Sequence, residues 1–225
     1  MIDMFLRGCG GLEAAGAYLG VGIREVRPGE VHVGLIYRSF ANDLQFLHLA
    51  WQDDLRLDTP SGTYFYAACD IDSTNAFFLS MMAESVARVN VGRKINWGWT
   101  YEGSSALFDT HGNLSDERAA MTCASFILGL FVTYGMPIVR PETWPSRLED
   151  KLWALDMLGR LSCGGEVSAQ NLEHLSSAIS GMTRVRPTEV AVAAAGIGQA
   201  KPPFCYDEIQ SPSEQLKCAI TERKV

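Results

Sequence analysis

Three side chains that lie far apart in the sequence could together perform thiol chemistry: Cys123, His32 and His48. A cysteine attacks a carbonyl carbon as its thiolate, and a free thiol is only slightly ionised at neutral pH. A helix N-terminus and a neighbouring imidazolium can lower the pKa of a thiol by several units. These residue types therefore indicate acyl transfer to water, with Cys123 as the nucleophile and a histidine as its base.

The two histidines must be positioned by a sheet. Residues 31–37 and 44–51 are rich in β-branched and aromatic side chains, which predicts two antiparallel strands joined by a polar turn. Opposed residues in such a hairpin have a constant index sum, so an even sum places His32 and His48 on one face, and a sum of 80 places them directly opposite. Gly34 lies on the same face and should leave room for a closely packed helix. We therefore expect one imidazole to orient the other.

The nucleophile must be delivered by a helix. A helical pattern covers residues 115–134 and ends at Gly135, and Cys123 lies near the start of its apolar part. If the helix begins at Ser115 or Asp116, Cys123 lies in its middle, where the effect of the helix dipole on the thiol fades. The pattern therefore predicts the helix but leaves open whether its N-terminus activates the sulfur.

The other elements complete an α+β fold. Residues 8–22 contain scattered glycines and predict irregular structure with a short helix around 12–18. The further predicted elements are a third strand at 63–71, helices at 72–90, 145–161, 168–179 and 187–195, and a surface strap from residue 201 that ends in a short helix. We expect a small antiparallel sheet packed on the cysteine-bearing helix in residues 1–145, and a helical C-terminal extension in residues 146–225.

An aromatic loop precedes the cysteine segment. Residues 96–113 are loop-like and contain several large aromatic side chains, and such loops often line pockets. Trp97 and Tyr101 are therefore candidate substrate-binding residues, with simple packing as the alternative role.

Composition narrows the class of partner. The 225 residues include 19 basic and 26 acidic side chains, and the net charge of -7 disfavours nucleic acid and anionic membranes. The six cysteines form no C-x-x-C pair and no H-E-x-x-H motif is present, so we expect no metal and no cofactor. No secretory signal or membrane span is expected, since the longest apolar stretch covers only residues 124–134. A cytoplasmic protein is the simplest expectation, and export as an effector without a signal peptide is compatible with it.

Three short motifs follow one another in a characteristic order: His32-x-Gly34-x-x-Tyr37, Leu47-His48-Leu49 and Thr122-Cys123-x-x-Phe126. This order resembles the circularly permuted papain-like proteins, which include NlpC-type bacterial cysteine hydrolases and relatives of lecithin:retinol acyltransferase. The resemblance covers roughly residues 25–136. It implies that Cys123 is the nucleophile, that His32 is the base and that His48 orients His32.

The motifs also separate the branches of that superfamily. The acyltransferase branch typically has Trp after its first histidine and an Asn-Cys-Glu-His-Phe run, whereas this chain has Val33 and the run Thr122–Phe126. Hydrolysis of an amide, isopeptide or ester bond in a peptide-like or acyl substrate is therefore the leading hypothesis. A lipid acyltransferase or phospholipase and a non-catalytic binding module on the same scaffold are the alternatives.

Overall fold

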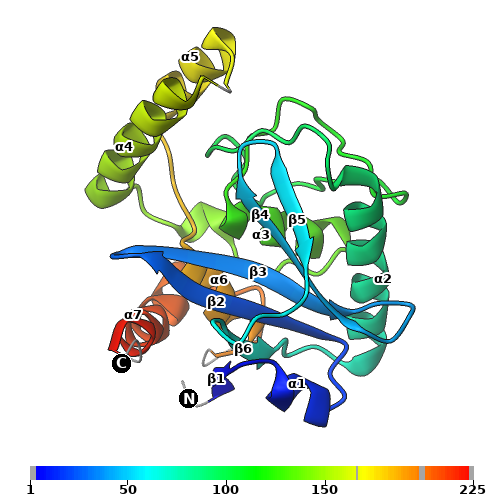
Figure 1. Cartoon of the computed structure of the whole chain (residues 1–225). Helices are drawn as coiled ribbons and strands as arrows, with labels where there is room; N and C mark the ends of the chain where they lie inside the picture. Colours follow the sequence, from blue (N-terminus) through cyan, green and yellow to red (C-terminus); the bar gives the residue numbers. More distant parts are fainter. Residues whose placement is uncertain (1–3, 166, 198–200, 223–225) are drawn as a thin grey trace.

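A six-stranded antiparallel sheet lies at the centre of the computed structural model, which describes residues 4–165, 167–197 and 201–222 (Figure 1). The order of the strands across the sheet is β1-β6-β2-β3-β4-β5. Their bounds are β1 (Leu6–Arg7), β2 (Leu19–Arg27), β3 (Glu30–Arg38), β4 (Leu44–Trp51), β5 (Asp54–Asp58) and β6 (Phe65–Ala68). The α+β class is confirmed, and the two strands predicted to carry the histidines are β3 and β4.

Strand β2 corrects the prediction for the glycine-rich N-terminal region. Residues 8–22 were expected to be irregular, yet β2 lies in the middle of the sheet between β6 and β3. Its glycines are required by close neighbours: a Cβ on Gly20 would lie 2.6 Å from the carbonyl oxygen of Ala67, and one on Gly22 would lie 2.5 Å from the ring of Tyr66. Glycine in a strand therefore reflects crowding here rather than a loop.

Strands β3 and β4 pair over only part of their length. Their ladder runs from Leu35↔Leu47 to Arg38↔Leu44, although β3 begins at Glu30 and β4 continues to Trp51. The unpaired halves therefore diverge, and the β4–β5 hairpin turns away from β2 and β3 in Figure 1. This separation opens the sheet on the side where the histidines lie.

The cysteine helix is shorter than predicted. Helix α3 (Cys123–Thr133) begins at the cysteine, so the prediction of a helix over residues 115–134 is wrong in its first part. Thr122 is the N-cap, because its side chain accepts a hydrogen bond from the backbone N–H of Ser125, and the Ser125 hydroxyl accepts one from the N–H of Thr122. This capping box ends the preceding turn and places Cys123 in the first helical position.

The remaining helices surround the sheet. Helix α2 (Ser73–Asn90) matches the helix predicted at 72–90 and has Asp72 as its N-cap, and α1 (Gly10–Ala14) is shorter than expected. The C-terminal helices are α4 (Leu148–Gly164), α5 (Ala169–Ala178), α6 (Pro187–Ala194) and α7 (Tyr206–Glu222), and a 3-10 turn (η2, Pro141–Thr143) precedes them. The predicted short terminal helix is thus the long helix α7. In the segment before α7, Phe204 forms an isolated bridge with Val139.

One hydrophobic core joins the sheet to the helices. Helices α3 and α6 are almost entirely buried and pack on the same face of the sheet, which carries Val33, Leu35 and Leu47. A smaller cluster that contains Phe46, Tyr64 and Tyr66 covers the opposite face. The core contains residues from both sides of position 145, so the boundary between the two predicted domains stays a prediction. No helix in the described ranges combines the length and apolar character needed to cross a membrane.

Candidate active site

Two histidines and an aspartate form a hydrogen-bonded chain across three strands. His32 on β3 and His48 on β4 are joined by a 2.9 Å contact between Nε2 of His32 and Nδ1 of His48. Nε2 of His48 lies 3.0 Å from Oδ2 of Asp58, the last residue of β5. Both imidazoles are buried, whereas the Asp58 side chain is 53% exposed. The chain therefore runs from a buried ring to a carboxylate in contact with solvent.

The strand register explains why the rings meet. The observed pairs of β3 and β4 have an index sum of 82, so His32 and His48 share one face, as expected for an even sum. They are not directly opposed: extending this register places Gly34 opposite His48 and leaves His32 on the diagonal, which is within reach of imidazole side chains. The space above Gly34 is filled by the ring of Phe46 and not by a helix, contrary to our expectation.

The direction of the hydrogen bonds fixes which nitrogen can act as a base. A carboxylate only accepts hydrogen bonds, so Nε2 of His48 must donate to Asp58. Nδ1 of neutral His48 is then an acceptor, and it must receive the N–H at Nε2 of His32. The lone pair of neutral His32 is therefore at Nδ1, which takes no part in this chain.

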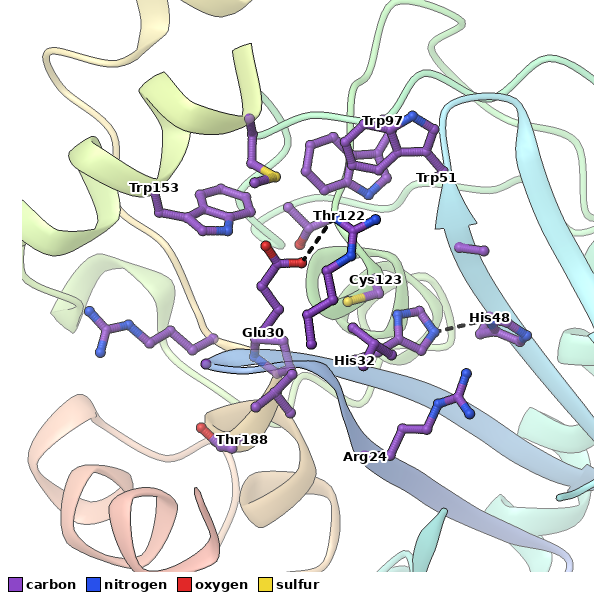
Figure 2. Close-up of a pocket in the computed structure, with 18 of the residues that line it drawn as sticks. Arg24, Glu30, His32, His48, Trp51, Trp97, Thr122, Cys123, Trp153 and Thr188 are labelled. Atoms are coloured by element: carbon purple, nitrogen blue, oxygen red, sulfur yellow. Dashed lines mark hydrogen bonds and ion pairs between the residues drawn. The ribbon is translucent and has the colours of Figure 1, made fainter. Parts of the chain in front are cut away.

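The sulfur of Cys123 lies next to the backbone of β3 at Val33 and in the same pocket as His32. The backbone N–H of Val33, the residue after His32, hydrogen-bonds to the sulfur, and both Cys123 and His32 line the same pocket. In Figure 2 Cys123 and His48 are drawn on opposite sides of the His32 ring. The three candidate catalytic residues thus line one pocket, and the hydrogen bond described among them joins the two histidines.

The pKa values in this site differ from the expectation of a thiolate–imidazolium pair. Burial, the adjacent His48 and the charges of Arg24 and Arg56 lower the pKa of His32 from 6.5 to about 3. Burial raises the pKa of Cys123 above its ordinary value, although the Val33 N–H, the charge of Arg184 and the first N–H groups of α3 act in the other direction. Desolvation therefore outweighs the helix N-terminus, a balance that the sequence left open. The resting pair is a neutral thiol and a neutral imidazole.

A buried ionic cluster beside Cys123 contains one positive charge too many. Arg147, Arg184 and Arg186 share two carboxylates, those of Asp150 and Glu189, which are 1% and 2% exposed. Arg147 contacts both carboxylates at 2.6 Å and Arg186 contacts Asp150 at 2.9 Å, whereas Arg184 approaches Asp150 only to 3.5 Å. The three arginines therefore leave a net charge of one unit in a poorly solvated place.

Arg184 is the least closely paired of these arginines, and its charge acts on the sulfur of Cys123. Its guanidinium lies 3.5 Å above the ring of Trp153, and its Nε is buried without a hydrogen-bond partner. Burial lowers the pKa of Arg184 to about 10, with the Cys123 sulfur among the groups that oppose the shift. An anion formed at Cys123 would thus complete the charge balance of the cluster.

The pocket around these residues has a volume of about 1040 Å³. Trp97, one of the two predicted substrate-binding residues, lines it together with Trp51 and Trp153, whose ring centroids lie 4.4 and 5.8 Å from that of Trp97. Tyr101 does not line this pocket. It borders a smaller neighbouring cavity, and its hydroxyl donates a hydrogen bond to the carbonyl oxygen of Ser105.

Sequence reasoning missed several residues of this site. Asp58 lies on β5, a strand that was not predicted, and the Phe46↔Asp58 pairing puts its carboxylate on the same face as His48. Arg24 lies on β2, just beyond residues 8–22, in a segment for which no strand was predicted. Arg184 and Trp153 come from distant segments, and no local pattern marks them.

The described residues contain no group of three or more histidine, cysteine, aspartate or glutamate side chains arranged to hold a metal ion. Fold and site together define an α+β protein in which a cysteine at a helix N-terminus and a His–His–Asp chain border one pocket. Comparisons with protein-family models, with curated proteins and with solved structures found no match.

Proposed function

We propose that this protein is a cysteine hydrolase that cleaves an amide, isopeptide or ester bond through an acyl-enzyme on Cys123. The observation that carries the proposal is the order of the hydrogen bonds from Asp58 through His48 to His32. This order leaves the basic lone pair at Nδ1 of His32, and the ring lines the same pocket as Cys123. The resemblance to permuted papain-like hydrolases assigns the same roles to the same three residues.

The first step is the attack of Cys123 on the carbonyl carbon of the substrate. As the sulfur–carbon bond forms, the thiol proton moves to Nδ1 of His32, and the carbonyl π electrons move to the oxygen. His32 then holds two N–H groups, and the one at Nε2 donates to His48, which in turn donates to Asp58. The carboxylate therefore stabilises the imidazolium through His48 without taking its proton.

The developing oxyanion has two available donors. Cys123 is the first residue of α3, so its backbone N–H has no acceptor inside the helix. The unpartnered Nε of Arg184 adds a charged donor in a poorly solvated place, where such interactions are strongest. Collapse of this intermediate transfers the proton of His32 to the leaving amine or alkoxide and leaves a thioester. A water molecule, deprotonated by His32, then attacks the thioester and releases the acid.

A base with such a low pKa is suited to this concerted step. His32 is not required to hold a proton in the free protein; it receives one as the sulfur or the oxyanion becomes negative beside it. The new negative charge favours the imidazolium and offsets the burial that lowers its pKa. Cys123 is thus activated during the attack rather than before it.

Acylation by p-nitrophenyl acetate tests the proposal. We expect a single acetyl group on Cys123 by peptide mass spectrometry, followed by slow release of acetate. Cys123→Ala should abolish acetylation at this site, and His32→Gln should slow it by roughly 100-fold, the usual contribution of a general base. Cys163→Ser removes an exposed thiol at the rim of the same pocket and should leave the rate unchanged. Acetylation of Cys123 at the same rate in His32→Gln would refute the assigned roles.

A further inference from the structure

Arg24 stands next to the proposed base. It is the direct partner of His32 in the register of β2 and β3, so the two side chains project from the same face of the sheet. Both line the pocket that contains Cys123. The guanidinium of Arg24 lies 4.5 Å from the centre of the Tyr64 ring, and Nη1 donates to the hydroxyl of Thr63 at 3.1 Å.

The charge of Arg24 is not compensated. None of the described acidic residues forms an ion pair with it, and its Nε is a buried donor without an acceptor. Arg56 borders the same pocket but is held by Asp54 through two contacts of 2.6 and 2.9 Å. A buried donor left without an acceptor destabilises the protein. The position therefore favours a ligand that brings a negative charge and accepts hydrogen bonds.

The same charge acts on the chemistry. A cation beside His32 disfavours the imidazolium that the proposed mechanism must form, and Arg24 is among the groups that lower the pKa of His32. A negative group placed on Arg24 would neutralise this effect. Binding at Arg24 would then make His32 a better base at the moment when the substrate is present.

We propose that Arg24 binds a carboxylate carried by the substrate, close to the bond that Cys123 attacks. This inference rests on the proposed hydrolase function and adds the substrate class. The opposite side of Cys123 is lined by Trp51, Trp97 and Trp153, as Figure 2 shows. The substrate is therefore an acyl compound with a carboxylate on the Arg24 side of the reactive carbonyl and an apolar or aromatic group on the other.

Two alkylating reagents of similar size but different charge test whether the site prefers a carboxylate. Iodoacetate carries a carboxylate and iodoacetamide carries a neutral amide, and both alkylate thiols. The measured quantity is the rate of alkylation by iodoacetate divided by the rate of alkylation by iodoacetamide, determined by peptide mass spectrometry at one mildly alkaline pH. We expect this ratio to be about tenfold higher at Cys123 than at Cys218, because tenfold is the size of one charge-assisted hydrogen bond. Cys218 is exposed on α7 and provides the reference within the same sample.

Matched variants locate the effect. Arg24→Gln should reduce the ratio at Cys123 to that at Cys218. Arg56→Gln removes an equal charge from the same pocket and should change the ratio at Cys123 less than twofold. Arg24→Lys keeps the charge but loses the planar fork, and should retain part of the preference. Labelling of the buried Cys69 reports unfolding, and if Arg24→Gln exposes Cys69 the test is made with Arg24→Lys.

The outcomes distinguish this inference from the proposed function. Equal ratios at Cys123 and Cys218, or equal effects of Arg24→Gln and Arg56→Gln, would overturn the carboxylate site and leave the hydrolase proposal standing. If instead Cys123 is acetylated by p-nitrophenyl acetate no faster in the wild type than in His32→Gln, the hydrolase proposal fails first. Loss of the charge preference in Arg24→Gln alone, together with His32-dependent acetylation, supports both.

Discussion

Gly34 leaves the space that His48 needs: a Cβ at this glycine would lie 2.8 Å from the Cβ of His48 and 2.4 Å from the ring of Phe46. Both distances are too short for real side chains, and both neighbours are held by the sheet. The absence of a side chain at position 34 is therefore a condition for the contact between His32 and His48.

The variant Gly34→Ala tests this condition. We expect the alanine to push the rings of Phe46 and His48 away, to destabilise the protein by about 1–3 kcal/mol and to slow acetylation of Cys123 about tenfold or more. Gly159→Ala on α4 is the control, since nothing lies within 4 Å of its added Cβ. Urea unfolding and the acetylation assay measure the two effects. An unchanged rate in Gly34→Ala would show that the histidine contact is not needed.

Asp58 should act only through His48. Replacement by asparagine keeps the size of the side chain but removes the negative charge that holds the N–H of His48 at Nε2. We expect Asp58→Asn to lower the acylation rate about tenfold while leaving the free energy of unfolding nearly unchanged, since this side chain is half exposed. Asp54→Asn is the matched control on the same strand, because Asp54 pairs with Arg56 and makes no hydrogen bond to His48. Equal effects of the two variants would argue against the relay.

Arg184 should set the acidity of the thiol. Its charge lowers the pKa of Cys123, so neutralising it must raise that pKa further. In Arg184→Met we expect the midpoint of the pH profile for iodoacetamide alkylation at Cys123 to move to higher pH. Arg186→Gln removes the same charge from the same cluster but from a residue that does not act on the sulfur, and its midpoint should stay near that of the wild type. A midpoint that moves equally in both variants would mean that only the total charge matters.

Acid should destabilise the protein through His32. Its folded-state pKa of about 3 lies below the ordinary value of 6.5, so the unfolded chain binds more protons between these limits. Stability is therefore complete above pH 6.5 and is lost as the pH falls toward 3. From pH 7 to pH 5 the His32 share of this loss is about 2 kcal/mol. Urea titrations at the two pH values should show a smaller loss in His32→Gln than in the wild type, and an equal loss would contradict a neutral buried His32.

Part of this architecture follows from local sequence patterns. The alternation in β3 and β4 and the even index sum place both histidines on one face, and the Asp72 cap marks the start of α2. The two-residue difference between the expected and observed registers could not be derived, because the position of the turn depends on how Gly34 and Phe46 pack.

Other parts depend on contacts between distant segments. The start of α3 was hidden because Ser115 and Asp116 are good helix caps, while the actual capping box uses Thr122 with Ser125 inside an apolar run. Burial raises the pKa of the Cys123 thiol, and burial of this residue cannot be derived from a sequence motif. Arg184 reaches Cys123 from a loop between α5 and α6, so only the folded chain reveals it.

One wall of the pocket comes from a different element than the chain of histidines does. Trp153 and Met157 belong to α4, which stands out from the body of the protein together with α5 in Figure 1, whereas Asp58, His48 and His32 belong to the sheet. Trp51, by contrast, shares β4 with His48. Sequence changes confined to α4 can therefore reshape one wall of the pocket while the hydrogen-bonded chain on the sheet stays as it is.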